Sequence, residues 1–243
     1  MRLALALALA AAPAAAAPVT YQVTDRTTVD VRIYKAGVAS GLAHDHVLRA
    51  GQLTGTLVYD PAEKRLVSVR FTVDARSLQV DPGRVRHQYG LPDDVDDDDR
   101  AQIAQNMRGP DQLAVDRYPT MTFESTGATA APDGRIELAG RLTIRGQTRD
   151  VRLPVAIWAT EERLQGKGEL RIRHADFGIK PYEAALGAIR NQERIDLIFA
   201  VRAAAEAPPA APASAPPATE RPPAAPPPPA PHAPPPAPPP PPP

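Results

Sequence analysis

The 243-residue sequence contains no cysteine. A disulfide framework is therefore excluded, and the stability of the fold must come from a packed core. Lys and Arg total 28 and Asp and Glu also total 28, so the formal net charge is zero. This balance gives no indication of a nucleic-acid groove. The sequence also lacks a phosphate-binding loop, a G-x-S-x-G motif and a dinucleotide fingerprint, so we predict neither catalytic residues nor a cofactor.

The two ends differ in composition from the middle of the chain. Residues 1–17, MRLALALALAAAPAAAA, combine one arginine, a Leu/Ala run and small residues, which is the layout of a secretory signal peptide. A membrane-spanning helix needs about 20 apolar residues, so we predict no membrane span here. Residues 204–243 are almost entirely proline and alanine and are predicted to be disordered. This tail is either a tether or docking peptide for an envelope partner, or a neutral extension.

Residues 18–203 are predicted to form one domain, in which apolar and polar residues alternate. Val67, Val69 and Phe71, for example, alternate with Ser68 and Arg70. An eight-stranded antiparallel arrangement can close into a barrel or fold into a two-sheet sandwich, and a closed barrel has room inside for one small ligand. The alternation predicts about eight strands, near residues 29–34, 53–59, 67–73, 121–123, 136–144, 151–157, 170–172 and 195–201.

One short helix is predicted between the strands. Ile103 and Met107 lie four residues apart within residues 100–107, and Gly109 followed by proline ends the pattern. The preceding aspartates suit a helix N-terminus, where they cap free amides. Proline and glycine also predict tight turns at residues 131–134 and 145–147.

Three motifs in this order resemble the YceI-like family of secreted lipid-binding proteins. They are DRYPTMTFEST at residues 116–126, LAGRLTIRGQTRDVRLPV at residues 138–155 and HADFGIK at residues 174–180. The resemblance covers about residues 19–202. It implies a lipocalin-like, eight-stranded antiparallel barrel in the bacterial periplasm, with a long apolar cavity for a polyisoprenoid or a similar long-chain amphipathic lipid. We therefore predict a non-catalytic binding or carrier protein, and the sequence leaves open whether it forms a homodimer.

In a ligand-holding barrel, the inward-facing apolar residues line the cavity. Trp158 follows Ile157 with opposite parity and is expected outside the cavity. The residues predicted to contact the ligand are Val31, Ile33, Leu57, Val69, Phe71, Phe123, Ile144, Leu153, Ile157, Leu170, Ile172, His174, Phe177, Leu197 and Phe199.

Two histidines, His44 and His46, flank Asp45 in the stretch GLAHDHVL. If this stretch is extended, both imidazoles point to one side, because side chains alternate along a strand. We predict that they form a polar mouth that orients the head group of a lipid. In the alternative, a metal-binding protein, His174 faces the same interior and completes a zinc or copper site. His87 is expected in a loop.

Overall fold

The computed structural model describes residues 17–206. The predicted signal peptide, apart from Ala17, and the predicted tail from residue 207 onward lie outside the described residues. The last strand ends at Ala205, two residues past the predicted domain end at residue 203. No helix within residues 17–206 has both the length and the apolar character needed to cross a bilayer.

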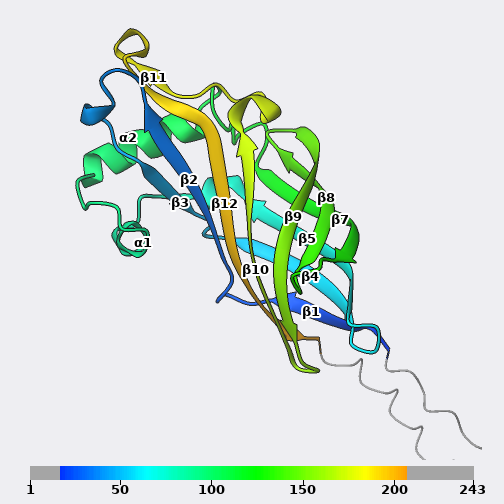
Figure 1. Cartoon of the computed structure of the whole chain (residues 1–243). Coiled ribbons are helices and arrows are strands. Elements are labelled where there is room, and N and C mark those ends of the chain that lie inside the picture. Colours follow the sequence, from blue (N-terminus) through cyan, green and yellow to red (C-terminus); the bar gives the residue numbers. More distant parts are fainter. Residues whose placement is uncertain (1–16, 207–243) are drawn as a thin grey trace, which may run out of the picture. The chain divides into compact units, whose positions relative to one another are not determined.

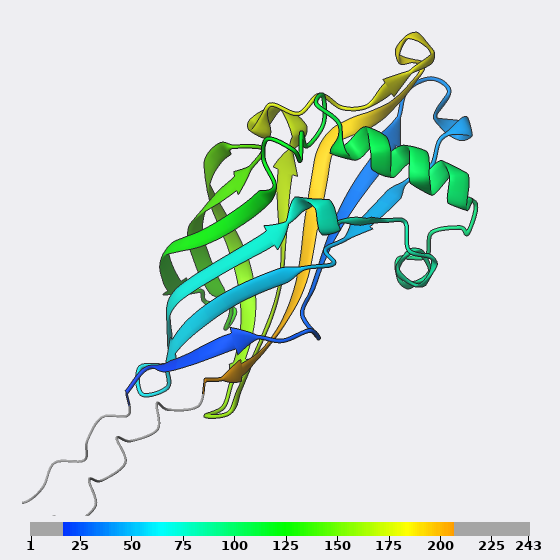
Figure 2. The ribbon, with the colours of Figure 1, turned by 180° about the vertical axis from the view of Figure 1, so that it is seen from behind.

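The described chain forms an antiparallel barrel with eight positions around its wall (Figures 1 and 2). Five positions hold single strands, β7 (Thr120–Ala130), β8 (Ile136–Ile144), β9 (Gln147–Ala159), β10 (Arg163–Arg173) and β12 (Ile189–Ala205). Each remaining position holds two consecutive strands, β1 (Val19–Val23) with β2 (Thr28–Ala36), β3 (His46–Arg49) with β4 (Leu53–Asp60), and β5 (Arg65–Asp74) with β6 (Gln79–Val80).

Pairing between β12 and β1 closes the barrel, with Tyr21 opposite Ala205 and Val23 opposite Ala203. Toward its other end, β12 pairs with β2, β2 with β3, and β3 with β6. Closure leaves no long free sheet edge in the wall. The predicted barrel is confirmed, and the sandwich alternative is excluded.

The eight predicted strands correspond to β2, β4, β5, β7, β8, β9, β10 and β12. Strands β1, β3, β6 and β11 (Glu183–Ala184) were not predicted, because they have only two to five residues each, too few to establish an alternation. Within β5 the predicted inward position of Val67 is wrong. The register shifts opposite Val58 and Tyr59, so that Leu66 is buried and Val67 is 41% exposed.

The predicted turn at residues 145–147 joins β8 to β9. Arg145 and Gly146 both have positive φ, 51° and 69°, as a two-residue type I′ hairpin loop requires. Residues 131–134 likewise connect β7 to β8, with Gly134 N–H donating to the carbonyl of Ala131 at 3.1 Å. Both predicted turns are confirmed.

Two α-helices lie between β6 and β7. The predicted helix is α2 (Asp97–Arg108), which starts earlier than expected because Asp96 caps it by accepting from the backbone N–H of Asp99. The other, α1 (Gly83–Gln88), contains His87, so the loop expected there is wrong. Short 3₁₀ segments at Ser40–Leu42, Ala75–Ser77, His174–Phe177 and Ala185–Gly187 complete the elements.

Three apolar clusters fill much of the barrel. The Tyr21 cluster lies toward β1 and comprises Tyr21, Leu57, Leu66, Val69, Leu138, Leu153, Val155, Leu164, Val201 and Ala203. The Phe177 cluster comprises Leu142, Ile144, Ile172, Phe177, Ile179 and Ile195. The Met107 cluster comprises Leu48, Leu78, Val80 and Met107.

Helix α2 covers an interruption in the barrel wall. Among the described strands β6 pairs only with β3, whereas β7 pairs with β5 and β8, so β6 and β7 are not hydrogen-bonded to each other. Met107 of α2 packs against Leu78 and Val80 at β6, and Met121 of β7 packs against the same cluster. The helix therefore completes the wall with side chains where backbone pairing stops.

Candidate ligand-binding cavity

An apolar cavity of about 130 Å³ lies inside the barrel, among the three clusters. Thr122 is the single polar residue of its lining. A buried water needs two to four polar partners, so this lining favours apolar groups. The lining residues are Val29, Leu53, Phe71, Val73, Met121, Thr122, Phe123, Leu138, Leu142, Leu153, Leu170, Leu197, Phe199 and Val201.

Each of the three phenylalanines in the lining packs on a glycine of a neighbouring strand. A Cβ added at Gly55 would overlap the ring of Phe71, and one added at Gly168 would overlap the ring of Phe199. Gly140 has the same relationship to Phe123. Because these glycines have no side chain, the rings lie over the adjacent strands instead of being displaced from them. We infer that these pairs help to keep space open in the barrel.

Of the predicted contact residues, six line this cavity: Phe71, Phe123, Leu153, Leu170, Leu197 and Phe199. The others pack elsewhere in the core. Leu57 and Val69 belong to the Tyr21 cluster, which Ile157 adjoins; Ile144, Ile172 and Phe177 belong to the Phe177 cluster; and Val31 and Ile33 pack against the Met107 cluster. Trp158 is 57% exposed, as expected for the outer face.

The cavity also has lining residues that the sequence analysis did not name as contacts. Val29, Leu53 and Val73 share the strand parity of predicted residues, so alternation was a sufficient signal for them. Thr122 has the opposite parity to Met121 and Phe123, and no such signal was available for it.

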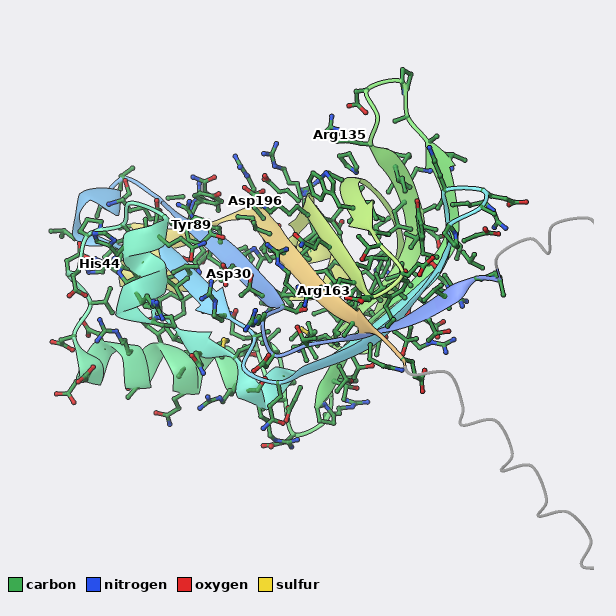
Figure 3. The ribbon with its side chains drawn as sticks, turned by 90° about the horizontal axis from the view of Figure 1, so that it is seen from below. Asp30, His44, Tyr89, Arg135, Arg163 and Asp196 are labelled. Carbon is green, nitrogen blue, oxygen red and sulfur yellow. The ribbon has the colours of Figure 1, made fainter. Side chains whose placement is uncertain are left out.

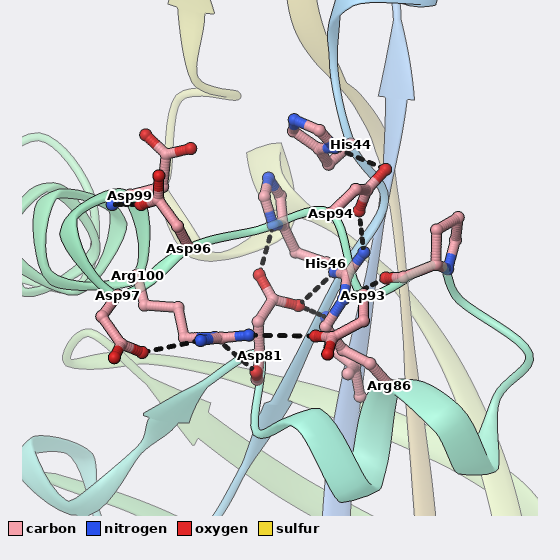
Figure 4. A network of polar contacts seen from close by, with 12 residues as sticks. His44, His46, Asp81, Arg86, Asp93, Asp94, Asp96, Asp97, Asp99 and Arg100 are labelled. Carbon is pink, nitrogen blue, oxygen red and sulfur yellow. Dashed lines mark hydrogen bonds and ion pairs between the residues drawn. The ribbon is translucent and has the colours of Figure 1, made fainter.

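His46 binds a carboxylate between β6 and α1, and His44 binds one in the segment that leads into α2 (Figure 4). Strand β3 starts at His46, so His44 precedes the strand and of the two histidines only His46 is part of it. His46 Nδ1 lies 2.6 Å from Asp81 Oδ2, and His44 Nδ1 lies 3.1 Å from Asp94 Oδ2. Neither histidine lines the apolar cavity. The imidazoles of both histidines instead interact with carboxylates of the same chain.

A buried ion pair between Asp81 and Arg86 lies at the centre of this network. Their side chains are 0% and 1% exposed, and Arg86 Nη1 donates to Asp81 Oδ1 at 2.8 Å. Arg86 also donates to Asp94 and to the carbonyls of Asp45 and Pro92. Burial by itself would raise the pKa of Asp81, but His46, the N–H of Val47 and Arg86 together lower it. The network fastens α1 and the approach to α2 against β3.

His174 is not part of this network. It is 3% exposed in the 3₁₀ segment after β10, and its Nδ1 lies 3.1 Å from the carbonyl oxygen of Glu193. Burial lowers the pKa of His174. Within residues 17–206 no three His, Asp or Glu side chains form a group that could hold a metal ion. The three histidines of the metal-binding alternative are therefore not brought together.

A second polar cluster lies on the outer face of the barrel, where Figure 3 labels Asp30, Tyr89 and Asp196. Asp196 is 1% exposed and accepts from Tyr34 Oη at 2.7 Å and from Arg171 and Arg194. Burial would raise the pKa of Asp196, but these donors lower it to about 2. The alternation of the sequence places Asp30 and Asp196 on the outer faces of their strands. It gave no indication that their carboxylates would be buried there.

Asp30 forms the other half of the outer cluster. It is 2% exposed, and its carboxylate accepts from Arg49 Nε and Nη2, both at 2.7 Å, and from Tyr89 Oη at 3.0 Å. Burial and the neighbouring Asp30 carboxylate raise the pKa of Tyr89 to about 12. These contacts join β2, β3 and α1 on the outside of the barrel.

The closed barrel with an apolar cavity inside has a lipocalin-like architecture, which is suited to binding an apolar ligand. More specifically, the chain belongs to the YceI-like family, because the model of the YceI-like domain matches residues 21–203. Among solved structures, Burkholderia cenocepacia BcnA aligns with a TM-score of 0.54 and 18% identity, over 73% of this chain and 96% of that one. A Campylobacter jejuni YCEI protein aligns with a TM-score of 0.50 and 15% identity, over 66% and 85%.

Curated relatives from two bacterial species are also similar. UPF0312 proteins of Vibrio cholerae are 29% identical over 138 residues, which is 54% of this chain and 64% of theirs. A UPF0312 protein of Azotobacter vinelandii is 27% identical over 116 residues, or 45% and 58%. The matched part thus spans somewhat less than two thirds of these relatives.

Proposed function

We propose that this protein is a non-catalytic periplasmic carrier that holds the chain of an isoprenoid or a similar long-chain amphipathic lipid inside the barrel. The observation that supports this most directly is the cavity, whose lining is apolar except for Thr122. An apolar lining discriminates poorly between head groups but strongly between apolar and polar ligands.

The energetics of burial are sufficient for binding without any chemistry. Each buried methylene contributes about 0.8 kcal/mol, so a five-carbon isoprene unit contributes about 4 kcal/mol before ordering costs. The cavity of about 130 Å³ is smaller than the range of about 300–1,000 Å³ typical of ligand pockets. A lipid of several isoprene units therefore requires side chains of the lining to move outward.

Lipid extraction tests the proposal directly. Protein purified from the periplasm is extracted with organic solvent, and the extract is analysed by mass spectrometry for prenyl and other long-chain lipids. Leu197→Trp fills the cavity that Leu197 lines and is expected to remove the bound lipid. Val67→Trp, which adds the same ring at an exposed position of β5, is the matched control and is expected to retain it. A lipid-free parent protein, or equal lipid content in both variants, contradicts the proposal.

The periplasmic location is tested separately by cell fractionation. Intact mass measurement of the exported chain is expected to show removal of about residues 1–17. Full-length mass in the cytoplasmic fraction would contradict export without affecting the lipid-binding proposal.

A further inference from the structure

Two loops at the end of the barrel opposite β1 expose large apolar side chains. The β2–β3 loop carries Val38 and Leu42, whose side chains are 97% and 79% exposed. The hairpin between β11 and β12 carries Leu186, which is 109% exposed, more than in an extended reference chain. In Figures 1 and 2 this hairpin projects beyond the barrel at the end far from β1.

These two loops form a single surface. The backbone N–H of Ala39 donates to the carbonyl of Ala188 at 2.9 Å. Gly37 has φ 98°, and a Cβ there would overlap the carbonyl oxygen of Ala188, so the two backbones touch. We call Val38, Leu42 and Leu186 with the backbone that joins them the apolar tip.

The backbone of the hairpin is strained where it presents its leucine. Leu186 has φ 56° and ψ 36°, and Ala185 before it has φ 48°. The left-handed conformation is energetically unfavourable for a residue other than glycine. Since Leu186 is fully exposed, no packing within residues 17–206 offsets this cost. A strained residue that projects an apolar side chain into solvent indicates a contact made outside the described chain.

Charged residues flank the two segments of the apolar tip in the sequence. Residues 36–43, AGVASGLA, and residues 184–189, AALGAI, contain no charged side chain. Within four residues of these two ranges the sequence has four cations, Arg32, Lys35, Lys180 and Arg190, and three carboxylates, Asp45, Glu183 and Glu193. An apolar centre with flanking cations matches the interface of a bilayer, where apolar side chains insert among acyl chains and cations meet phosphates.

We propose that the apolar tip docks this protein on the surface of a lipid bilayer. The three side chains of the apolar tip project separately from the end of the barrel. A fluid acyl layer can accept them without a complementary pocket. They are also too few to bury the area of about 1,200–2,000 Å² of a stable protein interface. The inference deepens the proposed lipid-carrier function, on which it rests, by naming the surface with which the protein meets a membrane.

Vesicle co-sedimentation tests this docking. The full chain is mixed with vesicles of phosphatidylethanolamine and phosphatidylglycerol, and the bound fraction is compared for the parent, Leu186→Asp and Leu42→Asp. All proteins carry the same ends, so residues outside the barrel contribute equally. We expect each tip variant to bind at least tenfold more weakly, because a carboxylate cannot enter the acyl layer. Val67→Asp, an exposed apolar-to-acid change on β5, is the matched control and is expected to bind like the parent.

A fluorescence measurement locates the contact. Trp158 is the single tryptophan of the sequence, so Leu186→Trp in a Trp158→Phe background reports on the tip alone. The emission of the introduced indole is expected to shift to the blue with vesicles and to be quenched by brominated acyl chains. Equal vesicle binding by the parent and Leu186→Asp, or an unshifted emission of the introduced indole, overturns the proposal. Tip-dependent self-association without vesicle binding overturns it in favour of a protein contact.

Lipid binding in solution separates this inference from the function on which it rests. Titration of delipidated protein with a short-chain prenyl alcohol, without vesicles, is expected to give the same affinity for the parent and for Leu186→Asp. Loss of solution binding in this variant would show that Leu186 acts on the cavity instead of on docking. Failure of the parent to bind any prenyl lipid would contradict the carrier function, whatever the vesicle result.

Discussion

The ring of Phe199 on β12 lies directly over Gly168 on β10, and the two residues are register partners. Any side chain at residue 168 would displace that ring from the strand it covers. The absence of a side chain at this position of the barrel wall therefore affects the space inside the barrel. Substitution of Gly168 is the most direct test of how the cavity stays open.

Gly168→Ala is expected to destabilise the fold by about 1–3 kcal/mol, the usual cost of an overpacked core. It is also expected to weaken the binding of a prenyl lipid, because the displaced ring of Phe199 occupies the cavity that it lines. Gly166→Ala is the matched control on the same strand. A Cβ there meets only ordinary contacts, 3.7 Å from Val201 Cβ and 3.9 Å from the carbonyl oxygen of Ala156. Urea unfolding and lipid titration measure both effects, and indistinguishable variants would refute the account of Phe199.

Leu164→Ala is expected to lower the free energy of unfolding by about 2–5 kcal/mol, because the side chain is 0% exposed within the Tyr21 cluster. Leu164 itself is not part of the cavity lining, although its cluster contributes Leu138, Leu153 and Val201 to it. Lipid affinity of the folded fraction is therefore expected to stay within about twofold of the parent. Chemical denaturation gives the first quantity, and titration well below the midpoint gives the second.

Asp81→Asn removes a carboxylate from a fully buried ion pair and leaves the guanidinium of Arg86 with one charged partner fewer. Breaking a buried pair in this way costs about 3–5 kcal/mol. Because the fold lowers the pKa of Asp81 from its ordinary 3.8, the stabilisation is present above that value and is lost as the pH falls through the lower folded-state pKa. Unfolding curves between pH 7 and pH 2 are expected to be flatter for the variant below about pH 4, and equal acid sensitivity would contradict this assignment.

His46→Ala is expected to destabilise the fold more than His44→Ala. The side chain of His46 is 16% exposed and contacts the buried Asp81, whereas that of His44 is 33% exposed and contacts the exposed Asp94. Exposed ion pairs contribute at most about 1 kcal/mol. Thermal unfolding with and without added zinc separates this role from metal binding. A zinc-dependent rise in melting temperature that both variants abolish would restore the metal-binding alternative.

The carboxyl group of Asp196 is expected to titrate at about pH 2, well below its ordinary value of 3.8. Its stabilising contribution is therefore expected above about pH 4 and is lost as the pH falls toward 2. Carbon NMR of the side-chain carboxyl measures the titration. Tyr34→Phe removes one donor to this carboxylate and is expected to raise its pKa toward the ordinary value.

The sequence by itself determined the eight long strands, their inward faces except at Val67, the hairpin turn at Arg145 and Gly146, and a helix that follows a run of aspartates, though not its start at Asp97. These features depend on residues within a few positions of one another, through side-chain alternation, turn conformation and capping of local amides. The motifs that contain Phe123, Gly140 and Phe177 also indicated the YceI-like family. Their residues meet the same local requirements of strand and turn conformation.

Only the tertiary structure decided which inward residues line a cavity and which fill the core. Leu57 and Leu153 share the alternation signal, yet only Leu153 reaches the cavity. The partners of Phe199 and His46 were beyond sequence reasoning for the same reason. Gly168 and Asp81 are brought to them by the pairing of β10 with β12 and of β3 with β6, across separations of 31 and 35 residues. The alternation of apolar and polar residues predicts which face of a strand is buried. The cavity between the buried faces, however, depends on how all eight positions of the barrel close around it.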